Sequence, residues 1–458
     1  MQDDAGQRAT AWFLALSAVY FAAQALLRIW FGGTLNLDEA EMLLMTRQWS
    51  WGYGPQPPLY NWLQILSFKL FGLGIAGVVV LKDFGLWLAG AGMWFAMRRA
   101  FPDWRAAAAA ALSLAYVPNI IFEFQRATSH SIALLVMICW TFWAWFRVMA
   151  KQDWQGWLML GLVMGLGGLS KWNYWAVPAG LAVASIGFWQ QRTQWRGPAL
   201  AMLVAALVVA LPYTWSVSHP TDSLASVRKL YGMPSPIWPW LLGMLSLAVN
   251  LLAGMALQLL IGVPMWFFAA RGKMQPAQMA TRIFLRAAGL SLAVTALLVV
   301  MFGVTNIEAR WLVPIMIFAT AAGFGWMAPA LSPRAFRLLP VFAVICAAIT
   351  LFGMIDVRRA ATSTRDMTPL ADLAGRLKPD RVESDFYLGG NLKLLRPDLD
   401  VRYLGETATA GDWPEHLLIL GIVPQGVLVL EEGEVTLTAR NYPDRPMTVK
   451  WAMVAAPS

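Results

Sequence analysis

The sequence predicts a polytopic α-helical membrane protein that ends in a small α/β unit. Apolar residues make up 58% of the 458 residues and charged residues only 13%, about half the charge of a typical soluble domain. Many apolar runs approach about 20 residues, the length that an α-helix needs to cross the hydrocarbon core of a bilayer. After residue 356 the apolar runs shorten to strand length among Pro, Gly and acidic residues, which indicates a separate unit over 356–458.

We expect about eleven membrane spans, the shorter of them tilted, broken or re-entrant. They are placed at 11–31, 76–97, 106–122, 130–149, 157–170, 174–189, 198–215, 241–270, 287–304, 311–329 and 338–355. Cations such as Arg98, Arg99, Arg147 and Lys151 fall in alternate loops, and the positive-inside rule makes that side cytoplasmic. We therefore expect a bacterial inner-membrane protein with a cytoplasmic N-terminus and a periplasmic C-terminal unit. The net charge of +9 then reflects topology, and no nucleic acid is expected as a partner.

Within the membrane domain, residues 1–355, two outer-face loops stand out, at 32–75 and 216–240. The first is expected to hold a short amphipathic helix from Glu41 to Trp51, a Gly/Pro turn cluster, and a second amphipathic stretch from Leu59 to Phe71. The second is rich in proline and aromatic residues, which indicates an ordered interfacial loop or lid.

The C-terminal unit is expected to contain short strands and one helix that closes near Asp372 to Leu377. Strand patterns occur at Phe386–Leu388, Val401–Leu404, Leu417–Val423, Val427–Leu430 and Val435–Leu437.

Three acids, Asp38, Glu39 and Glu41, directly follow the first apolar run. Acids beside a membrane are costly unless a cation, a metal or a reaction uses them. In a helix, Asp38 and Glu41 would share a face because they are three residues apart, while Glu39 would point elsewhere. The alternative is that these acids only stabilise the first turn of a helix through its dipole.

Cations recur at the ends of spans on the outer side, where the charge rule does not favour them. Arg126 is flanked by Glu123 and His130, Lys171 lies near Tyr174, and Arg310 precedes Trp311. Each cation alone could be a snorkelling anchor, and His130 alone could be an interfacial hydrogen-bonding residue. Together with the acids they indicate a site for an anionic lipid headgroup, a phosphate or a pyrophosphate.

The sequence carries no Walker motif, no GxGxxG, no paired CxxC and no HExxH. An outward-facing enzyme without a nucleotide cradle would draw its energy from an activated lipid. A transporter or lipid flippase without glycosyl transfer is the second interpretation, and a non-catalytic envelope scaffold is the third. The transporter is disfavoured because charge gathers at one surface rather than at mid-membrane. The scaffold is disfavoured because it would leave the acids and cations without a joint task.

An ordered set of motifs resembles membrane glycosyltransferases of the C-type (GT-C) fold. The resemblance is to the bacterial branch related to protein O-mannosyltransferases and lipid A aminoarabinose transferases, a glycosyltransferase family 39-like group. It spans the whole chain. Its motifs are Asp38-Glu39-Ala40, Trp51-Gly52-Tyr53 with Pro57-Pro58-Leu59, Gly161 to Lys171, Arg310 to Pro314 and Gly389-Gly390-Asn391-Leu392.

The resemblance implies an inverting transfer of sugar from a polyprenyl-phosphate donor to an envelope lipid or glycan, with protein as another acceptor class. Asp38 aligns with the catalytic acid, which would act as general base, and Glu39 is its neighbour in the motif. Lys171 and Arg310 match motif positions that would neutralise the donor phosphate, and charge placement adds Arg126. The acceptor or auxiliary residues are Glu41, Glu123, His130 and Tyr174.

Two positions depart from the family pattern. Ala127 stands where relatives often carry an acid, and Gln56 stands where many have His. If the missing acid helps to hold a metal or the acceptor, Glu123 is the candidate to replace it. No cofactor is required by the pattern, and a divalent metal stays open.

Overall fold

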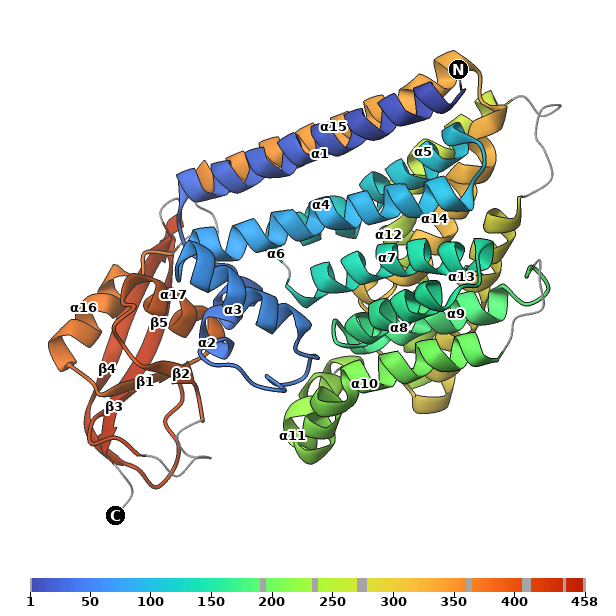
Figure 1. Cartoon of the computed structure of the whole chain (residues 1–458). Helices are drawn as coiled ribbons and strands as arrows, with labels where there is room; N and C mark the ends of the chain where they lie inside the picture. Colours follow the sequence, from blue (N-terminus) through green and yellow to red (C-terminus); the bar gives the residue numbers. More distant parts are fainter. Residues whose placement is uncertain are drawn as a thin grey trace.

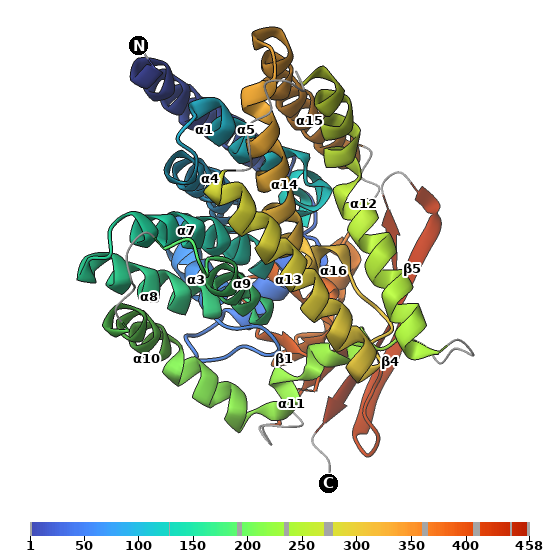
Figure 2. The ribbon, with the colours of Figure 1, turned by 90° about the vertical axis from the view of Figure 1, so that its right-hand side faces the viewer.

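The computed structural model describes residues 2–127, 129–189, 195–232, 238–269, 278–359, 365–405, 413–439 and 442–455. Its helices form a bundle with a β-sheet unit at one end (Figure 1). The first helix begins at the end of the molecule opposite to the sheet, as the view in Figure 2 also shows. This arrangement confirms the predicted fold class.

Eight helices of the described chain are long and apolar enough to cross a membrane. They are α1 (Gln2–Phe31), α4 (Ile75–Ala100), α7 (His130–Ala150), α10 (Arg196–Ser218), α12 (Pro239–Phe268), α13 (Met279–Phe302), α14 (Val313–Met327) with η7 (Ala328–Ala330), and α15 (Pro333–Arg359). The most apolar windows of α7 and α14 are 78% buried, against 6% for α1 and 17% for α15. The first pair is therefore central, and the second lies at the periphery.

The expected count of about eleven spans exceeds what the described helices provide by length. A ninth span exists only if two helical pieces, bent by 65° relative to each other, are taken as one. The first piece is α5 (Trp104–Leu112) with η1 (Ser113–Tyr116), and the second is η2 (Asn119–Glu123) with α6 (Phe124–Ala127). The segments expected at 157–170 and 174–189 are helical but short, as α8 (Trp154–Gly168) and α9 (Ala176–Ala184). The 15 residues of α8 reach only about 22 Å, less than the bilayer core.

The glycine-rich motif that begins at Gly161 has a packing role. A Cβ atom on Gly161 would lie 2.5 Å from the carbonyl oxygen of Ala201, and one on Gly165 would lie 2.6 Å from Cβ of Val208. Small residues four apart allow helix backbones to approach closely in membranes. The motif thus brings α8 against α10.

The first outer loop, expected at 32–75, folds into α2 (Leu37–Met45) and α3 (Leu59–Phe71). The second amphipathic stretch is confirmed as α3. The first was placed too late: the helix begins at Leu37 instead of Glu41, because Asn36 caps it. The backbone N–H of Asn36 donates to Oε2 of Glu39 at 3.0 Å, as the third residue of a capping box does. Asp38 and Glu39 therefore lie in its first turn, and Glu41 lies in the second.

The second outer loop, expected at 216–240, contains α11 (Pro220–Ser223) and η4 (Ala225–Leu230), while residues 233–237 lie outside the described chain. The backbone N–H groups of Thr305 and Asn306 donate to the carbonyl of Leu230 at 3.0 and 3.1 Å. These bonds hold η4 against the loop between α13 and α14.

After α15, the chain forms a five-stranded sheet in the order β2-β1-β3-β5-β4. The strands β1 (Arg381–Ser384), β2 (Val401–Tyr403) and β3 (Leu417–Leu420) are parallel, and β4 (Leu428–Ala439) and β5 (Tyr442–Ala455) add an antiparallel hairpin. Two helices, α16 (Thr368–Leu377) and α17 (Phe386–Leu395), complete the unit.

One of the expected strands is wrong, and two others are parts of one longer strand. Phe386–Leu388 forms the first turn of α17, because the side chain of Asp385 caps the backbone N–H of Leu388 at 2.8 Å. Val427–Leu430 and Val435–Leu437 belong to the single strand β4, which bends at register shifts rather than breaking. In Figure 1, α2, α3 and α17 lie between the helical bundle and the sheet.

Candidate active site

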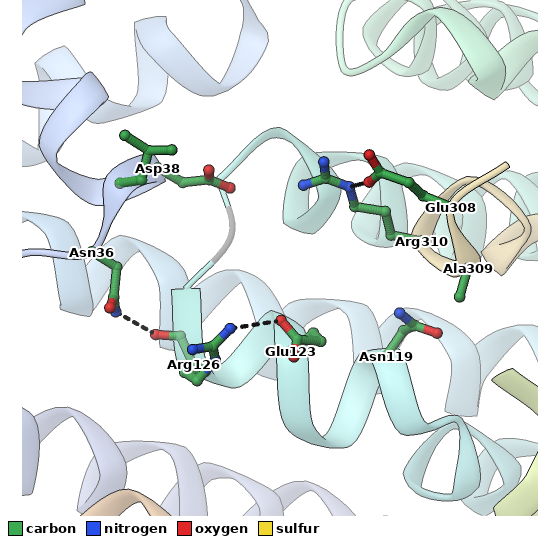
Figure 3. A pocket seen from close by; sticks show the side chains of 9 residues that line it. Asn36, Asp38, Asn119, Glu123, Arg126, Glu308, Ala309 and Arg310 are labelled. Atoms are coloured by element: carbon green, nitrogen blue, oxygen red, sulfur yellow. Dashed lines mark hydrogen bonds and ion pairs between the residues drawn. The ribbon is translucent and has the colours of Figure 1, made fainter. Parts of the chain in front are cut away.

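A pocket of about 440 Å³ opens at the end of the bundle that faces the C-terminal unit. Figure 3 shows its wall. Polar and charged side chains from three separate parts of the chain line it, together with two apolar residues. The lining residues are Asn36, Leu37, Asp38, Asn119, Glu123, Arg126, Glu308, Ala309 and Arg310.

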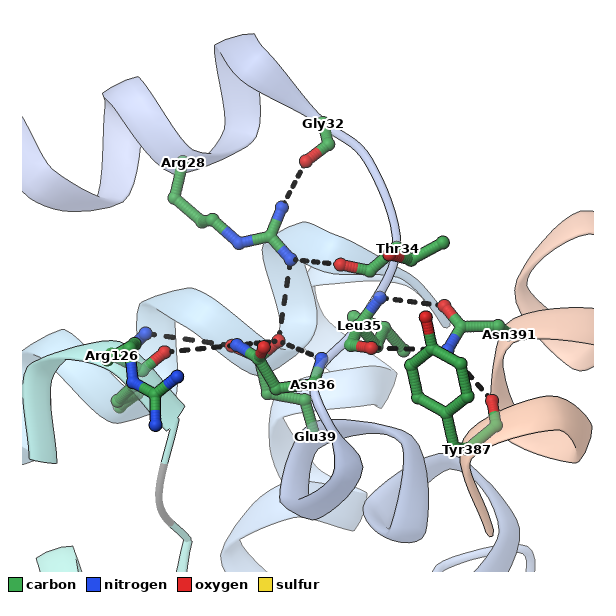
Figure 4. A network of polar contacts seen from close by, with 10 residues as sticks. Arg28, Gly32, Thr34, Leu35, Asn36, Glu39, Arg126, Tyr387 and Asn391 are labelled. Carbon is green, nitrogen blue, oxygen red and sulfur yellow. Dashed lines mark hydrogen bonds and ion pairs between the residues drawn. The ribbon is translucent and has the colours of Figure 1, made fainter. Parts of the chain in front are cut away.

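The first turn of α2 directs its acids in two directions. Asp38 lies on the pocket wall, and its carboxylate points toward the guanidinium of Arg310 in Figure 3. Glu39 is only 2% exposed and lies outside the pocket lining. Its carboxylate pairs with Arg28 at 3.4 Å (Figure 4). It also pairs with Lys82 at 3.6 Å, and both cations are buried. Glu39 therefore anchors α2 to α1 and α4.

The adjacent Lys82 and Asp83 would suggest an ion pair at the membrane interface. Lys82 instead pairs with Glu39. Its side chain is 1% exposed and faces the bundle interior. Charges at this depth are tolerated when they are paired with one another.

Two Arg–Glu ion pairs form separate parts of the pocket wall. Arg126 on α6 pairs with Glu123 on η2 at 3.1 Å, and both side chains are more than half exposed. Arg310 on η6 (Ala309–Trp311) pairs through Nε with Glu308. η2 is a single π-helical turn, a geometry frequent at functional sites. An anionic ligand could replace either internal carboxylate, so both guanidinium groups are available for ligand binding.

Lys171 lies next to the pocket, where its Nζ donates to Oγ of Ser131 at 3.0 Å. Burial, together with the positive charge of Arg310, lowers the pKa of Lys171 to about 8, and Asp38 opposes this shift. The amine remains mostly protonated at neutral pH, and its positive charge is poorly solvated. Such a cation gains more from an anionic ligand than a solvated one does.

The Asp38 carboxyl is partly buried, and burial raises its pKa above the ordinary range. Positive charges oppose the shift, Arg310 first, followed by Lys171 and Lys229. The carboxyl is therefore a stronger base than a solvated aspartate, and it stays within electrostatic reach of three cations.

Lys229 is a site residue that the sequence analysis missed. It is an exposed residue of η4, and the side chain of Asn306 donates to its carbonyl at 3.0 Å. Its charge acts on Asp38, Glu41 and Lys171. The signal that selected Arg126, a cation in an outer loop, could have found it.

Glu41 follows Asp38 by one helical turn, as the spacing predicts. Burial and the nearby Asp38 carboxylate raise the pKa of Glu41 to about 7, while Lys229 lowers it. Glu41 is not part of the pocket lining. It is the neighbour that would compete with Asp38 for a proton.

Like Glu41, two further predicted auxiliary residues do not line the pocket. Tyr174 is fully buried, its hydroxyl pairs with that of Thr141, and its ring fills the space that a Cβ on Gly167 would need. His130 packs beside Tyr60 with ring centroids 5.9 Å apart, and its Nδ1 lacks a hydrogen-bond partner within the described residues. Tyr174 is thus placed as a packing residue.

The sequence left open whether the protein binds a divalent metal. No cluster of three or more His, Cys, Asp or Glu side chains that could hold a metal occurs among the residues that the structure describes. Residue 127 ends α6, and its side chain, like Thr128, lies outside the described part of the chain.

Comparison with known proteins places the chain among membrane glycosyltransferases. Residues 55–215 match the family described as dolichyl-phosphate-mannose-protein mannosyltransferase. The lipopolysaccharide core galacturonosyltransferase RgtA of Rhizobium johnstonii is 30% identical over 449 residues, which cover 93% of this chain and 87% of the relative. RgtB of the same organism is 29% identical over 446 residues, covering 92% and 89%.

Solved structures share the fold. ArnT from Cupriavidus metallidurans superposes with a TM-score of 0.58 at 15% identity in the apo state, covering 97% of this chain and 98% of ArnT. The structure of ArnT bound to undecaprenyl phosphate gives a TM-score of 0.60 at 14% identity, covering 97% of each chain.

Proposed function

Because the chain belongs to the family of GT-C-fold membrane glycosyltransferases that includes the lipopolysaccharide core galacturonosyltransferases, we propose that it transfers a sugar from a polyprenyl-phosphate donor to an envelope glycolipid. The acceptor that we propose is the lipopolysaccharide core, at the outer face of the inner membrane. The observation that carries the proposal is a partly buried carboxylate, Asp38, beside a pocket surrounded by cations.

In the proposed reaction Asp38 is the general base. It takes the proton of an acceptor hydroxyl while that oxygen attacks the anomeric carbon from the face opposite to the phosphate. The bond between the anomeric carbon and the phosphate oxygen breaks, and the lipid phosphate leaves with the bonding electrons. Lys171, Arg310 and Lys229 stabilise the negative charge that develops on it, so no general acid is needed. The sugar carbon is inverted.

We place the pocket on the outer side of the membrane. Arg98 and Arg99 lie in the last turn of α4, and Arg147 lies in the last turn of α7. Both helices run away from the pocket end (Figure 1). The positive-inside rule then supports a cytoplasmic location for the far end.

The sugar that we propose is a uronic acid. The two relatives in Rhizobium are named as galacturonosyltransferases, so their sugar carries a carboxylate in addition to the donor phosphate. Arg126 lies on a part of the wall formed by η2 and α6, apart from the Arg310 pair (Figure 3). We assign Arg126 to the sugar carboxylate, which would replace Glu123 as its partner.

The test is transfer by purified protein in sealed liposomes sorted by orientation, with polyprenyl phosphates that carry galacturonic acid, galactose or mannose. Purified lipopolysaccharide core is the acceptor and is added outside. We expect transfer from the uronate donor, and only where the pocket end faces outward. Equal transfer when the pocket end faces the liposome interior would contradict the placement of the active site at that end. Silence across the panel with folded protein would overturn the donor class.

Arg126→Gln should lower kcat/KM for the uronate donor by about tenfold to a hundredfold, the value of a hydrogen bond to a charged group. Transfer from the neutral galactosyl donor should stay within about twofold, because that sugar offers no carboxylate. Glu123→Gln is the matched control, since it removes the internal partner and keeps the guanidinium. An equal loss for both donors would assign Arg126 to the phosphate instead.

Lys171→Ala, Arg310→Ala and Lys229→Ala should each raise the donor KM by about tenfold, because each removes one charge-assisted contact to the phosphate. Initial rates at varied donor concentration measure this. Arg228→Ala is the control for Lys229, as it removes an exposed cation from the same turn. An unchanged donor KM would leave these cations as interfacial anchors.

A further inference from the structure

The helix that carries Asp38 is shared between the bundle and the C-terminal unit. Met42 of α2 belongs to the core of the bundle, whereas Leu44 is 5% exposed and belongs to the core of the C-terminal unit. α2 therefore has a partner on each side, and its position depends on both.

Asn391 of α17 makes the polar part of this contact. Its Oδ1 accepts from the backbone N–H of Leu35 at 2.7 Å, and its Nδ2 donates to the carbonyl of Leu35 at 3.2 Å (Figure 4). A further bond from Nδ2 to the carbonyl of Tyr387 at 2.8 Å fixes the amide on its own helix. Asn391 and Leu35 are each 1% exposed, so no water replaces these bonds.

The two bonds act on the extended segment that directly precedes α2. Leu35 lies outside the helical hydrogen-bond pattern, so the side chain of Asn391 supplies the partners for both its N–H and its carbonyl. Asp38 follows Leu35 by three residues. The contact with Asn391 therefore fixes the direction in which α2 begins on the side of the C-terminal unit. On the other side it is set by the pairing of Glu39 with Arg28 and Lys82.

Close packing supports the same contact. A Cβ atom on Gly390 would lie 2.4 Å from the carbonyl oxygen and 2.7 Å from Cα of Ala40. Only glycine allows α17 to approach the backbone of α2 so closely. The Gly-Gly-Asn motif thus provides both the close approach and the hydrogen bonds.

We propose that the C-terminal unit positions the general base, with Asn391 as the positioning residue that fixes the segment before Asp38. The proposal rests on the proposed function, in which Asp38 is the base. A displacement of about 1 Å in a reacting group can cost a hundredfold in rate. The contact of Asn391 with Leu35 is then needed for full activity, although no residue of the C-terminal unit touches the reacting atoms.

Asn391→Ala should lower kcat by about tenfold to a hundredfold and leave the donor KM within about twofold. The split is expected because Lys171, Arg310 and Lys229 lie on other elements than α2. The acid limb of the kcat–pH profile should also move to lower pH, because a less constrained Asp38 becomes better solvated. A merely structural role would lower the amount of active enzyme without moving that limb.

Further variants keep the test decisive if Asn391→Ala folds poorly. Asn391→Asp keeps the acceptor for Leu35 N–H but removes the donor to the carbonyls of Leu35 and Tyr387, so it should lose activity as well. Gly390→Ala should reproduce the loss, because the added methyl group meets backbone atoms. Gly375→Ala is the matched control and should be neutral, because the added methyl group would lie 3.5 Å from the flexible end of the Arg396 side chain.

Lys393→Ala is the second control. Lys393 lies on α17 and donates to the carbonyls of Pro397 and Leu399, within the C-terminal unit. The inference is overturned if Lys393→Ala and Asn391→Ala change kcat and the pH limb alike. It is also overturned if folded Asn391→Ala keeps both at wild-type values. Failure of the base assignment would appear separately, as wild-type transfer by Asp38→Asn.

Discussion

Asp38→Asn should lower kcat for glycosyl transfer by about a thousandfold, within the range that a positioned general base contributes. Asparagine has nearly the same shape, so the cap of α2 and the pocket wall should persist. The donor KM should change little, since removing a negative charge beside Lys171 and Arg310 does not weaken phosphate binding. Single-turnover transfer and donor titration on the same preparation measure both quantities.

The pH dependence of the wild type adds an independent check on Asp38. A base must be deprotonated to act, so activity should fall as the pH falls through the pKa of Asp38. Burial raises that pKa, and the acid limb should therefore lie above the pH at which a solvated aspartate titrates. Glu41→Gln should leave the limb in place, because burial and Asp38 raise the pKa of Glu41 to about 7 and its carboxyl is mostly neutral while Asp38 titrates. Transfer at the wild-type rate by Asp38→Asn would exclude Asp38 as the base.

Glu39→Gln should destabilise the protein by about 3–5 kcal/mol, as the loss of one partner from a buried ion pair does. Glutamine preserves the size of the side chain, but it leaves Arg28 and Lys82 buried without their common carboxylate. The effect is measured by heating the protein in detergent and monitoring the loss of its monodisperse peak in size-exclusion chromatography. The matched variant is Glu41→Gln, which has no such pair and should unfold near the wild-type temperature.

A double variant tests whether the loss comes from the unpaired charge. Glu39→Gln combined with Lys82→Met should recover part of the stability, because removing both partners of a buried pair is often nearly neutral. A wild-type unfolding temperature for Glu39→Gln would show that the pairing contributes little. In that case the N-cap of α2 alone would hold the first turn.

The sequence was sufficient for the fold class and for selecting Asp38, which lines the pocket. Long apolar runs specify spans independently of their partners, and the three-residue spacing placed Asp38 and Glu41 on one helical face. The sequence was insufficient where a contact between distant parts of the chain determines the direction or position of a side chain. The direction of Glu39 depends on Arg28 and Lys82, which approach it from two other helices. The place of Lys229 depends on hydrogen bonds to a loop some 75 residues further on.

Local competition explains the other differences. The sequence from Phe386 to Leu388 has strand propensity, but a capping Asp385 starts a helix there. Tyr174 stands beside a motif lysine, yet its ring is directed into the space over Gly167. Neither outcome follows from spacing, because each depends on which neighbour the folded chain supplies.

The contact between Asn391 and Leu35 joins residues 356 positions apart. A ribosome adds about 5–20 residues per second, so roughly 20 to 70 s separate the synthesis of its two ends. During that interval the segment before α2 lacks the partner that fixes it. The start of α2 therefore reaches its final geometry only near the end of synthesis, and a chain that stops before residue 391 lacks this contact.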